Sequence, residues 1–152
     1  EHPSVIEEAR RQGLDPAREM LWFIEEIAAY GRSRNPDFIV IQQNGARLAQ
    51  LQPGILRVVD GIAQEGVWFE GIATDDWHEP LGHDVPVSAG LTAEYVETLQ
   101  RYLDAGLVVL DCEYALDKAD EAYALAREQG YVPYTTRRSL SRLSTTPPPE
   151  YP

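Results

Sequence analysis

Four short apolar runs, each followed by polar side chains, constrain the fold of this chain more than any other feature. A run of ~4–8 apolar residues suits a strand that is buried on both faces, as in a parallel sheet covered by helices. Parallel strands need a crossover connection, which is usually a helix. The sequence therefore predicts an α/β fold with one parallel sheet, whose strands follow each other in sequential order at residues 38–44, 61–68, 107–112 and 131–135.

Helical spacing of apolar residues predicts the crossovers. Asp15 and Pro16 form a good helix start, since Asp caps helix N-termini and Pro fits the first turn, and this helix runs to about Tyr30. A second helix is predicted to begin at Thr92, and a third at Lys118–Gln129, with Asp117 as its cap. Glycine follows each of the three helices, and two of them lead directly into the next strand, as is usual for close-packed α/β units.

The segment from Glu70 to Leu91 is an unusually long connection. Structureless loops of this length are uncommon in compact domains and are often functional, so we expect a loop on the active face. It contains His78, His83, Asp75, Asp76 and Asp84. These side chains are candidate metal ligands, but their irregular spacing favours a solvated acidic loop over a metal site.

Composition excludes several classes of function. The formal net charge of −12 argues against nucleic acid as a partner and against anionic membrane surfaces. No run of ~18 apolar residues is present, so no membrane span is expected. The single cysteine, Cys112, rules out a disulfide framework within one chain, and it is expected in the core rather than as a catalytic thiol. No phosphate-binding loop or dinucleotide fingerprint occurs, and no cofactor or metal is predicted.

Polar side chains follow the predicted strands, at the edge of the sheet where parallel α/β folds place their functional groups. They include two carboxylates on one strand and an isolated one on another. Together with tyrosines, this set suggests a polar substrate such as a sugar; its members are Asn44, Glu65, Asp111, Glu113, Tyr114, Tyr134 and Arg137.

The order of four segments resembles a known family of glycoside hydrolases. The segments are Asn35-Pro-Asp-Phe-Ile-Val-Ile-Gln-Gln-Asn-Gly45, Asp60-Gly-Ile-Ala-Gln-Glu65, Gly106-Leu-Val-Val-Leu-Asp-Cys-Glu-Tyr114, and Gly130-Tyr-Val-Pro-Tyr134 with Arg137 and Leu140. In this order they are similar to the later half of the polygalactosaminidase-like enzymes, glycoside hydrolase family 114, some relatives of which were labelled cysteinyl-tRNA synthetase-like.

The resemblance implies a (β/α)8 barrel of which this chain holds only the C-terminal half, strands five to eight. A complete barrel typically takes ~250 residues, whereas this chain has 152. Residues 1–14 would then be the remnant of an upstream element, 15–143 the half barrel, and 144–152 a proline-rich tail that is extended or disordered. Secretion is an expectation from the family alone.

The resemblance also implies hydrolysis of amino-sugar polysaccharide by two acidic residues. One matches Glu65, and the other belongs to a fourth strand that this sequence lacks. Glu65 lies beside Val67 and Trp68 in an apolar strand, where desolvation would suit a general acid. Asp111 and Glu113 alternate with Cys112, so they share a face and are expected to point into the barrel or its mouth. There they hold sugar hydroxyls or pair with Arg137 as structure.

Asn44, Tyr114 and Tyr134 are candidate subsite residues, or alternatively packing residues. Two other interpretations remain open at this point. One is a non-catalytic carbohydrate-binding or degenerate barrel, and the other is a small flavodoxin-like interaction domain. An isolated half barrel exposes strand edges, which invite association, so we expect the isolated chain to be inactive and to dimerise or aggregate.

Overall fold

The structure is a computed structural model that describes residues 3–76, 78–141 and 143. The chain begins with a helix, α1 (Pro3–Arg11), where the sequence predicted a loop or short helix. The proline-rich tail lies outside the described residues. Among the described residues, no helix has the length and apolar character that crossing a membrane requires.

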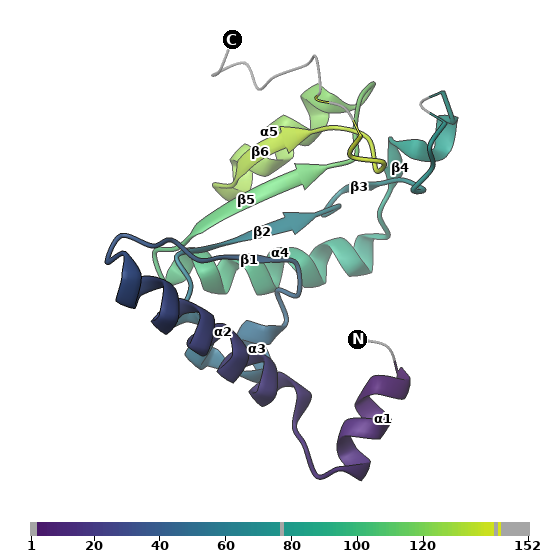
Figure 1. The fold of residues 1–152 in the computed structure, drawn as a ribbon. Helices are drawn as coiled ribbons and strands as arrows, with labels where there is room; N and C mark the ends of the chain where they lie inside the picture. The colour runs from purple at the N-terminus through teal and green to yellow at the C-terminus, as the bar shows by residue number, and fades with distance from the viewer. Residues whose placement is uncertain (1–2, 77, 142, 144–152) are drawn as a thin grey trace.

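One parallel sheet organises the fold (Figure 1). Its spatial order is β1-β2-β5-β6, so its strands are neighbours in the order in which they occur along the chain, and every pairing is parallel. The predicted parallel sheet in sequential order is thereby confirmed. The strands are shorter than or shifted from the predicted runs: β1 (Ile41–Gln43), β2 (Gly61–Glu65), β5 (Val108–Glu113) and β6 (Val132–Thr135).

The helices between the strands form where the apolar spacing predicts them. They are α2 (Pro16–Arg34), α3 (Leu48–Leu51), the 3-10 helix η1 (Pro53–Arg57), α4 (Ala89–Asp104) and α5 (Ala119–Gln129). Asp15 caps α2 as expected, through its carboxylate. Helix α4 begins earlier than predicted because Ser88 caps it by accepting the Leu91 N–H. The Thr92 hydroxyl instead donates to the carbonyl of Val67.

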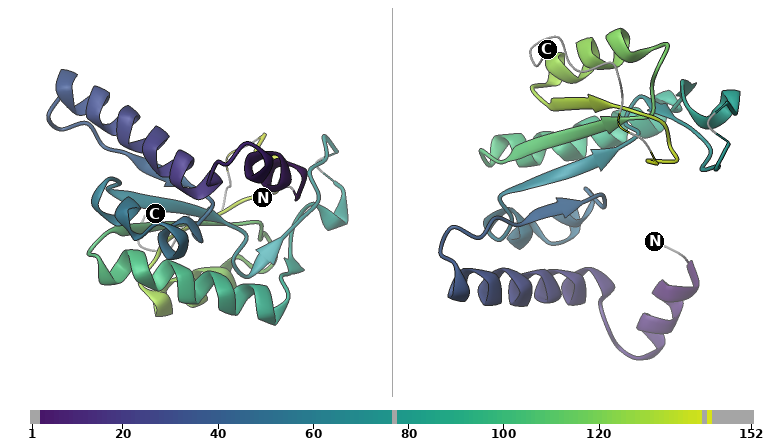
Figure 2. Two further views of the ribbon diagram at one scale, coloured as in Figure 1. Left: turned by 90° about the horizontal axis from the view of Figure 1, so that it is seen from below. Right: turned by 45° about the horizontal axis from the view of Figure 1, so that its top comes forward.

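The described helices cover one face of the sheet. A single apolar core joins residues of α2, α3, η1, α4 and α5 to Ile62 of β2 and Val109 of β5. Ile62 and Val109 are register partners, so they point to the same side. Figure 2 shows α3, α4 and α5 along that side. Helices α2, α3, α4 and α5 therefore share one face of the sheet, and the strands are not buried on both faces as their apolar runs suggested.

The opposite face of the sheet is open. Ile41, Val108 and Val132 lie on it with exposed fractions of 37%, 38% and 42%. Leu110, which is half-buried, lies two residues after Val108 on the same face of β5. Towards the carboxyl ends of the strands this face becomes polar, with Gln43, Glu65 and Tyr134. A parallel sheet normally has both of its faces covered, so this open apolar face departs from the usual arrangement.

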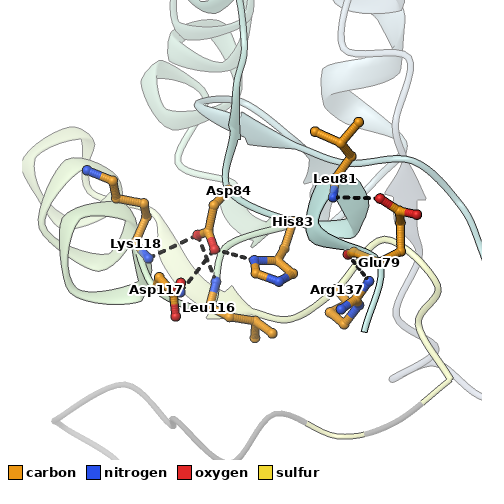
Figure 3. Close-up of polar contacts among 8 residues, drawn as sticks. All are labelled: Glu79, Leu81, His83, Asp84, Leu116, Asp117, Lys118 and Arg137. Carbon is orange, nitrogen blue, oxygen red and sulfur yellow. Dashed lines mark hydrogen bonds and ion pairs between the residues drawn. The ribbon is translucent and has the colours of Figure 1, made fainter. Parts of the chain in front are cut away.

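The long connection after β2 contains more structure than the sequence predicted. Two short strands, β3 (Phe69–Glu70) and β4 (Val85–Pro86), pair antiparallel, and the 3-10 helix η2 (Pro80–Gly82) lies between them. Arg137 closes this connection onto the segment that follows β6, because its guanidinium donates to the carbonyl oxygens of Asp76 and Glu79. Figure 3 shows the contact with Glu79. A side chain at Gly82 would clash with that guanidinium, at 1.9 Å from Nη2.

Asp84 of the same connection holds the turn that leads into helix α5. Its carboxylate accepts the backbone N–H groups of Leu116, Asp117 and Lys118, and it contacts the His83 imidazole (Figure 3). No side-chain hydrogen bond caps α5 at its own N-cap residue, Lys118, so the prediction that Asp117 caps this helix is wrong. We refer to the contact from Asp84 as the cap of α5; because it comes from a distant loop, it leaves no local spacing signal.

Replacing Asp84 with Asn should destabilise the fold and weaken its dependence on pH. Burial raises the pKa of Asp84, but the hydrogen bonds from His83 and the three N–H groups lower it more, and the net shift is downward. The stability from a lowered pKa is present above the pKa of the unfolded chain and is lost as pH falls through the folded value. We expect Asp84→Asn to lose about 1–2 kcal/mol at pH 7, measured by urea unfolding between pH 3 and 7.

The matched control is Asp117→Asn, at the residue expected to cap α5 from the sequence. It should change the free energy of unfolding by less than about 0.5 kcal/mol. Equal losses for Asp84→Asn and Asp117→Asn would contradict the assignment of the cap to Asp84.

Candidate functional site

Glu65 ends β2 on the open face of the sheet, and its carboxylate is surrounded by hydrogen-bond donors. The Gln43 amide donates to Oε1 at 3.0 Å, and the Asn44 amide donates to Oε2 at 3.3 Å. The Arg138 guanidinium forms an ion pair with Oε2 at 3.2 Å. Donors from the ends of β1 and β6 therefore converge on one carboxylate at the end of β2.

Asn44 holds Glu65 through both ends of its side-chain amide. Its side-chain oxygen accepts the N–H of Glu65 at 3.0 Å, while its amide nitrogen donates to the Glu65 carboxylate. It adopts a left-handed backbone, φ 56°, which Asn tolerates better than most residues. The prediction placed Asn44 at this mouth, and the structure puts it in direct contact with the candidate catalytic carboxylate.

Arg138 and Tyr114 complete the cluster. The guanidinium of Arg138 donates to the Tyr114 hydroxyl at 2.6 Å and lies over the Tyr114 ring, 5.0 Å from its centre. Tyr114 is also hydrogen bonded to Glu65, and burial, first among several causes, raises its pKa. The hydrogen bond to Tyr114 raises the pKa of Arg138. The arrangement fits a protonated tyrosine and a permanent cation beside Glu65.

These contacts correct the expected environment of Glu65. Val67 is fully buried in the apolar core behind the sheet, so it does not desolvate the carboxylate as the sequence suggested. Gln43, Asn44 and Arg138 all donate to the carboxylate. Such surroundings suit a carboxylate that accepts hydrogen bonds better than a carboxylic acid that must donate one.

Cys112 and Tyr134 are the register partners of Glu65 across the sheet, so all three point to the open face. Burial and the nearby carboxylates raise the pKa of Cys112 to about 12, which keeps the thiol protonated and unreactive at neutral pH. Tyr134 is half-buried beside it on the same face.

Asp111 and Glu113 were expected at the mouth, and this expectation is wrong. Both are buried on the helix-covered face, with exposed fractions of 2% and 0%. The Glu113 carboxylate accepts the backbone N–H groups of Val67, Trp68 and Phe69 at 2.6–3.0 Å. Glu113 therefore fixes the turn that follows Glu65. The alternation with Cys112 correctly predicted that Asp111 and Glu113 share a face of the sheet, but it does not determine which of the two faces that is.

Asp111 and Glu113 are two buried carboxyl groups on the helix-covered face. Burial raises the pKa of Asp111 well above its ordinary value, and the charge of Glu113 raises it further. Burial raises the pKa of Glu113 too, but Asp111 and the hydrogen bonds from the three backbone N–H groups oppose this. We therefore place a proton on Asp111, whose carboxyl oxygens have no hydrogen-bond partner among the described residues, and the negative charge on Glu113.

Arg137 was expected to bind substrate or to pair with the two carboxylates. It is buried, with 2% exposed, and its guanidinium donates to carbonyl oxygens of the long connection. The neighbouring Arg138 is the arginine that reaches Glu65. Adjacent residues of an extended segment point to opposite sides, so the two arginines after β6 indicated that one of them faces the site. The sequence did not show which one.

The described residues contain no group of three or more His, Cys, Asp or Glu side chains that could hold a metal ion. His83 and Asp84, considered above as possible ligands, are occupied in capping α5. The donors around Glu65 are amides, a hydroxyl and a guanidinium, a set that suits an organic, hydroxyl-bearing ligand.

Comparison with known proteins found relatives whose function is itself uncharacterized. No family model matches the chain. An uncharacterized protein of Deinococcus radiodurans is 30% identical over 132 residues, which make up 86% of this chain and 39% of the relative. An uncharacterized protein of Thermotoga maritima is 30% identical over 134 residues, 82% of this chain and 38% of the relative. The chain thus spans about two fifths of the length of the curated relatives it matches.

Substitutions of the two buried carboxyl groups should differ in their cost. Glu113→Gln places an amide N–H against backbone N–H donors, so we expect a loss of roughly 2–4 kcal/mol in the free energy of unfolding. Asp111→Asn replaces one neutral side chain with another of similar shape and should stay within about 1 kcal/mol of the parent at pH 7. Urea unfolding of both variants measures the difference.

The pH dependence adds a second test of the proton on Asp111. A raised pKa means that the folded state holds a proton that the unfolded state releases, so this contribution to stability falls as pH rises above the unfolded pKa of Asp111. Asp111→Asn should remove that fall. Equal destabilisation by the two substitutions, or an unchanged pH profile in Asp111→Asn, would refute this placement of the proton.

Proposed function

We propose that this chain is half of a (β/α)8 barrel glycoside hydrolase, in which Glu65 is one of the two essential carboxylates. The observation that carries the proposal is the open face of the sheet. It is apolar along the strands and polar at their carboxyl ends, where Glu65 lies with Gln43, Asn44 and Tyr134. Barrel enzymes place their catalytic residues at that end of the strands.

The one-sided covering supports a barrel over a flavodoxin-like domain. A doubly wound sheet carries helices on both faces, whereas the described helices of this chain share one core on one face. In a barrel the uncovered face lines the interior and is packed by side chains of the other strands. The relatives support this arrangement, because the part of each relative outside the match is longer than the matched part.

The surroundings of Glu65 favour the role of nucleophile or general base. Glycosidases need one carboxyl group as acid and a second as nucleophile or base. Because the groups around Glu65 donate hydrogen bonds, an accepting carboxylate fits there. The acid would then come from the remainder of a longer chain, about 5–5.5 Å from Glu65 in a retaining enzyme or about 6.5–9.5 Å in an inverting one.

An amino-sugar polysaccharide is the proposed substrate, by resemblance to the polygalactosaminidase-like enzymes. The amides of Gln43 and Asn44 present groups that bind sugar hydroxyls, and Tyr134 offers a ring for a sugar face. The acidic chain, with a net charge of −12, is compatible with a cationic, partly deacetylated polymer.

A second candidate is a barrel that binds carbohydrate without cleaving it. The observation that favours it is the ion pair between Glu65 and Arg138, which together with the Tyr114 hydrogen bond occupies the carboxylate as a structural pair would. Turnover distinguishes the two candidates, because a binding module keeps affinity for the polymer and has no hydrolysis.

Glu65→Gln in the full-length protein should lower the turnover of a partially deacetylated galactosamine polymer by roughly 10²–10⁴-fold. The substitution keeps the shape of the side chain but removes the carboxylate, so polymer affinity should change little. Reducing-end release measures turnover, and calorimetry measures binding. The isolated 152-residue chain should be inactive, because one carboxylate cannot supply both roles.

The control is Glu128→Gln, the same chemical change on an exposed residue of α5. It should leave turnover within about twofold, as expected for a surface substitution near the start of β6, at the opposite end of the strands from Glu65. Unchanged turnover in Glu65→Gln, or binding without hydrolysis by the parent, would exclude the catalytic assignment and favour the binding module.

A further inference from the structure

Helix α2 carries more apolar surface than the rest of the described fold covers. Its inner stripe, which includes Ala17, Ala28 and Gly31, packs against the chain. A second stripe lies beside the first on the helix and is exposed. Its members recur at spacings of three and four residues, as in a helix–helix seam: Met20, Phe23, Ile27 and Tyr30, with exposed fractions of 43–67%.

The exposed stripe continues into the free edge of the sheet. Phe38 packs against Gly31, where a Cβ would lie within 2.3 Å of the ring, yet Phe38 itself is 40% exposed. Ile39 beyond it is exposed as well. Strand β1 pairs only with β2, so its outer edge has no neighbouring strand in the described sheet. Figure 1 shows α2 beside this end of the sheet, next to β1.

A hollow of about 550 Å³ lies on this surface. Ile27, Tyr30, Gly31 and Phe38 line it, with Glu26, Arg34 and Asn35 completing the wall. A hollow with apolar walls and charged groups among its lining accepts one or two large apolar side chains from a partner. The other edge strand of the sheet is β6, and the neighbouring helix α5 has no such stripe. None of the exposed large apolar residues of the described chain belongs to α5.

We propose that this surface, formed by the exposed stripe of α2 and the free edge of β1, is an internal interface that a helix and a strand of the same longer polypeptide cover. A helix with a second apolar stripe beside its inward one normally buries both, and an open edge accepts a parallel strand. The partner must offer both elements at once, as one β–α unit preceding β1 in a barrel does.

The length of the relatives identifies the partner as part of the same polypeptide. Each relative has about three fifths of its chain outside the match, which is more than enough for the missing strand and helix. The inference rests on the half barrel in the proposed function but not on glycoside hydrolysis. A barrel with another activity would cover the surface in the same way.

Thermal unfolding of alanine variants tests the interface without any substrate. In the full-length polypeptide, Phe23→Ala and Ile27→Ala should lower Tm by roughly 5–15 °C, as expected for large apolar side chains that become buried. In the isolated chain, where these residues are exposed, the same substitutions should shift Tm by less than about 2 °C.

Two control variants calibrate the measurement. Leu99→Ala, in the core, should lower Tm in both forms, and Leu81→Ala, which is 57% exposed on the long connection, in neither. If Phe23→Ala matches Leu81→Ala in the full-length polypeptide, the surface is open and the proposal is overturned. That comparison decides the matter even if the isolated chain does not fold.

Light scattering identifies the occupant of the surface. A monomeric full-length protein that Phe23→Ala destabilises supports cover by its own chain. A dimer that Phe23→Ala dissociates would show that a second copy covers the surface, and this result would also overturn the proposal. Neither result depends on whether Glu65 is catalytic.

Discussion

A parallel sheet is stable when apolar layers cover both of its faces, and the described residues supply a layer for only one. The helices pack against Ile62 and Val109, while Ile41, Val108 and Val132 face outward from the other side. The open face, the free edge of β1 and the exposed stripe of α2 are three apolar or unpaired surfaces that the described fold leaves exposed. In the proposed barrel all three would be covered, because the interior fills with side chains from the remaining strands.

The candidate site depends on the buried face as much as on the open one. Glu65 ends its strand on the open side, and the next turn is held from behind by the Glu113 carboxylate through Val67, Trp68 and Phe69. On the site side, residues that end or follow β1 and β6 hold the carboxylate of Glu65. The carboxylates on the two faces of the sheet therefore have different roles, since Glu113 fixes the backbone and Glu65 is available to a ligand.

The sequence predicted the parallel order of the strands and the placement of Asn44 and Glu65, because apolar runs and strand ends are local signals. It did not predict contacts made across the fold. Asp84 caps α5 from a loop more than thirty residues earlier, and the choice between Arg137 and Arg138 depends on the path after β6. Asp111 and Glu113 were assigned to the wrong face, since alternation fixes a shared face but not its identity. Only the packing of α4 and α5 on the sheet decides that.

The structure of a full-length protein that carries this sequence tests the half barrel most directly. We expect eight parallel strands around one axis, with β1 paired on both edges and the open face of the present sheet inside. We also expect a second carboxylate about 5–9.5 Å from that of Glu65, across the mouth of the barrel. A sheet that stays four-stranded, or a Glu65 that faces bulk solvent with no acidic partner, would contradict the half barrel and its proposed site.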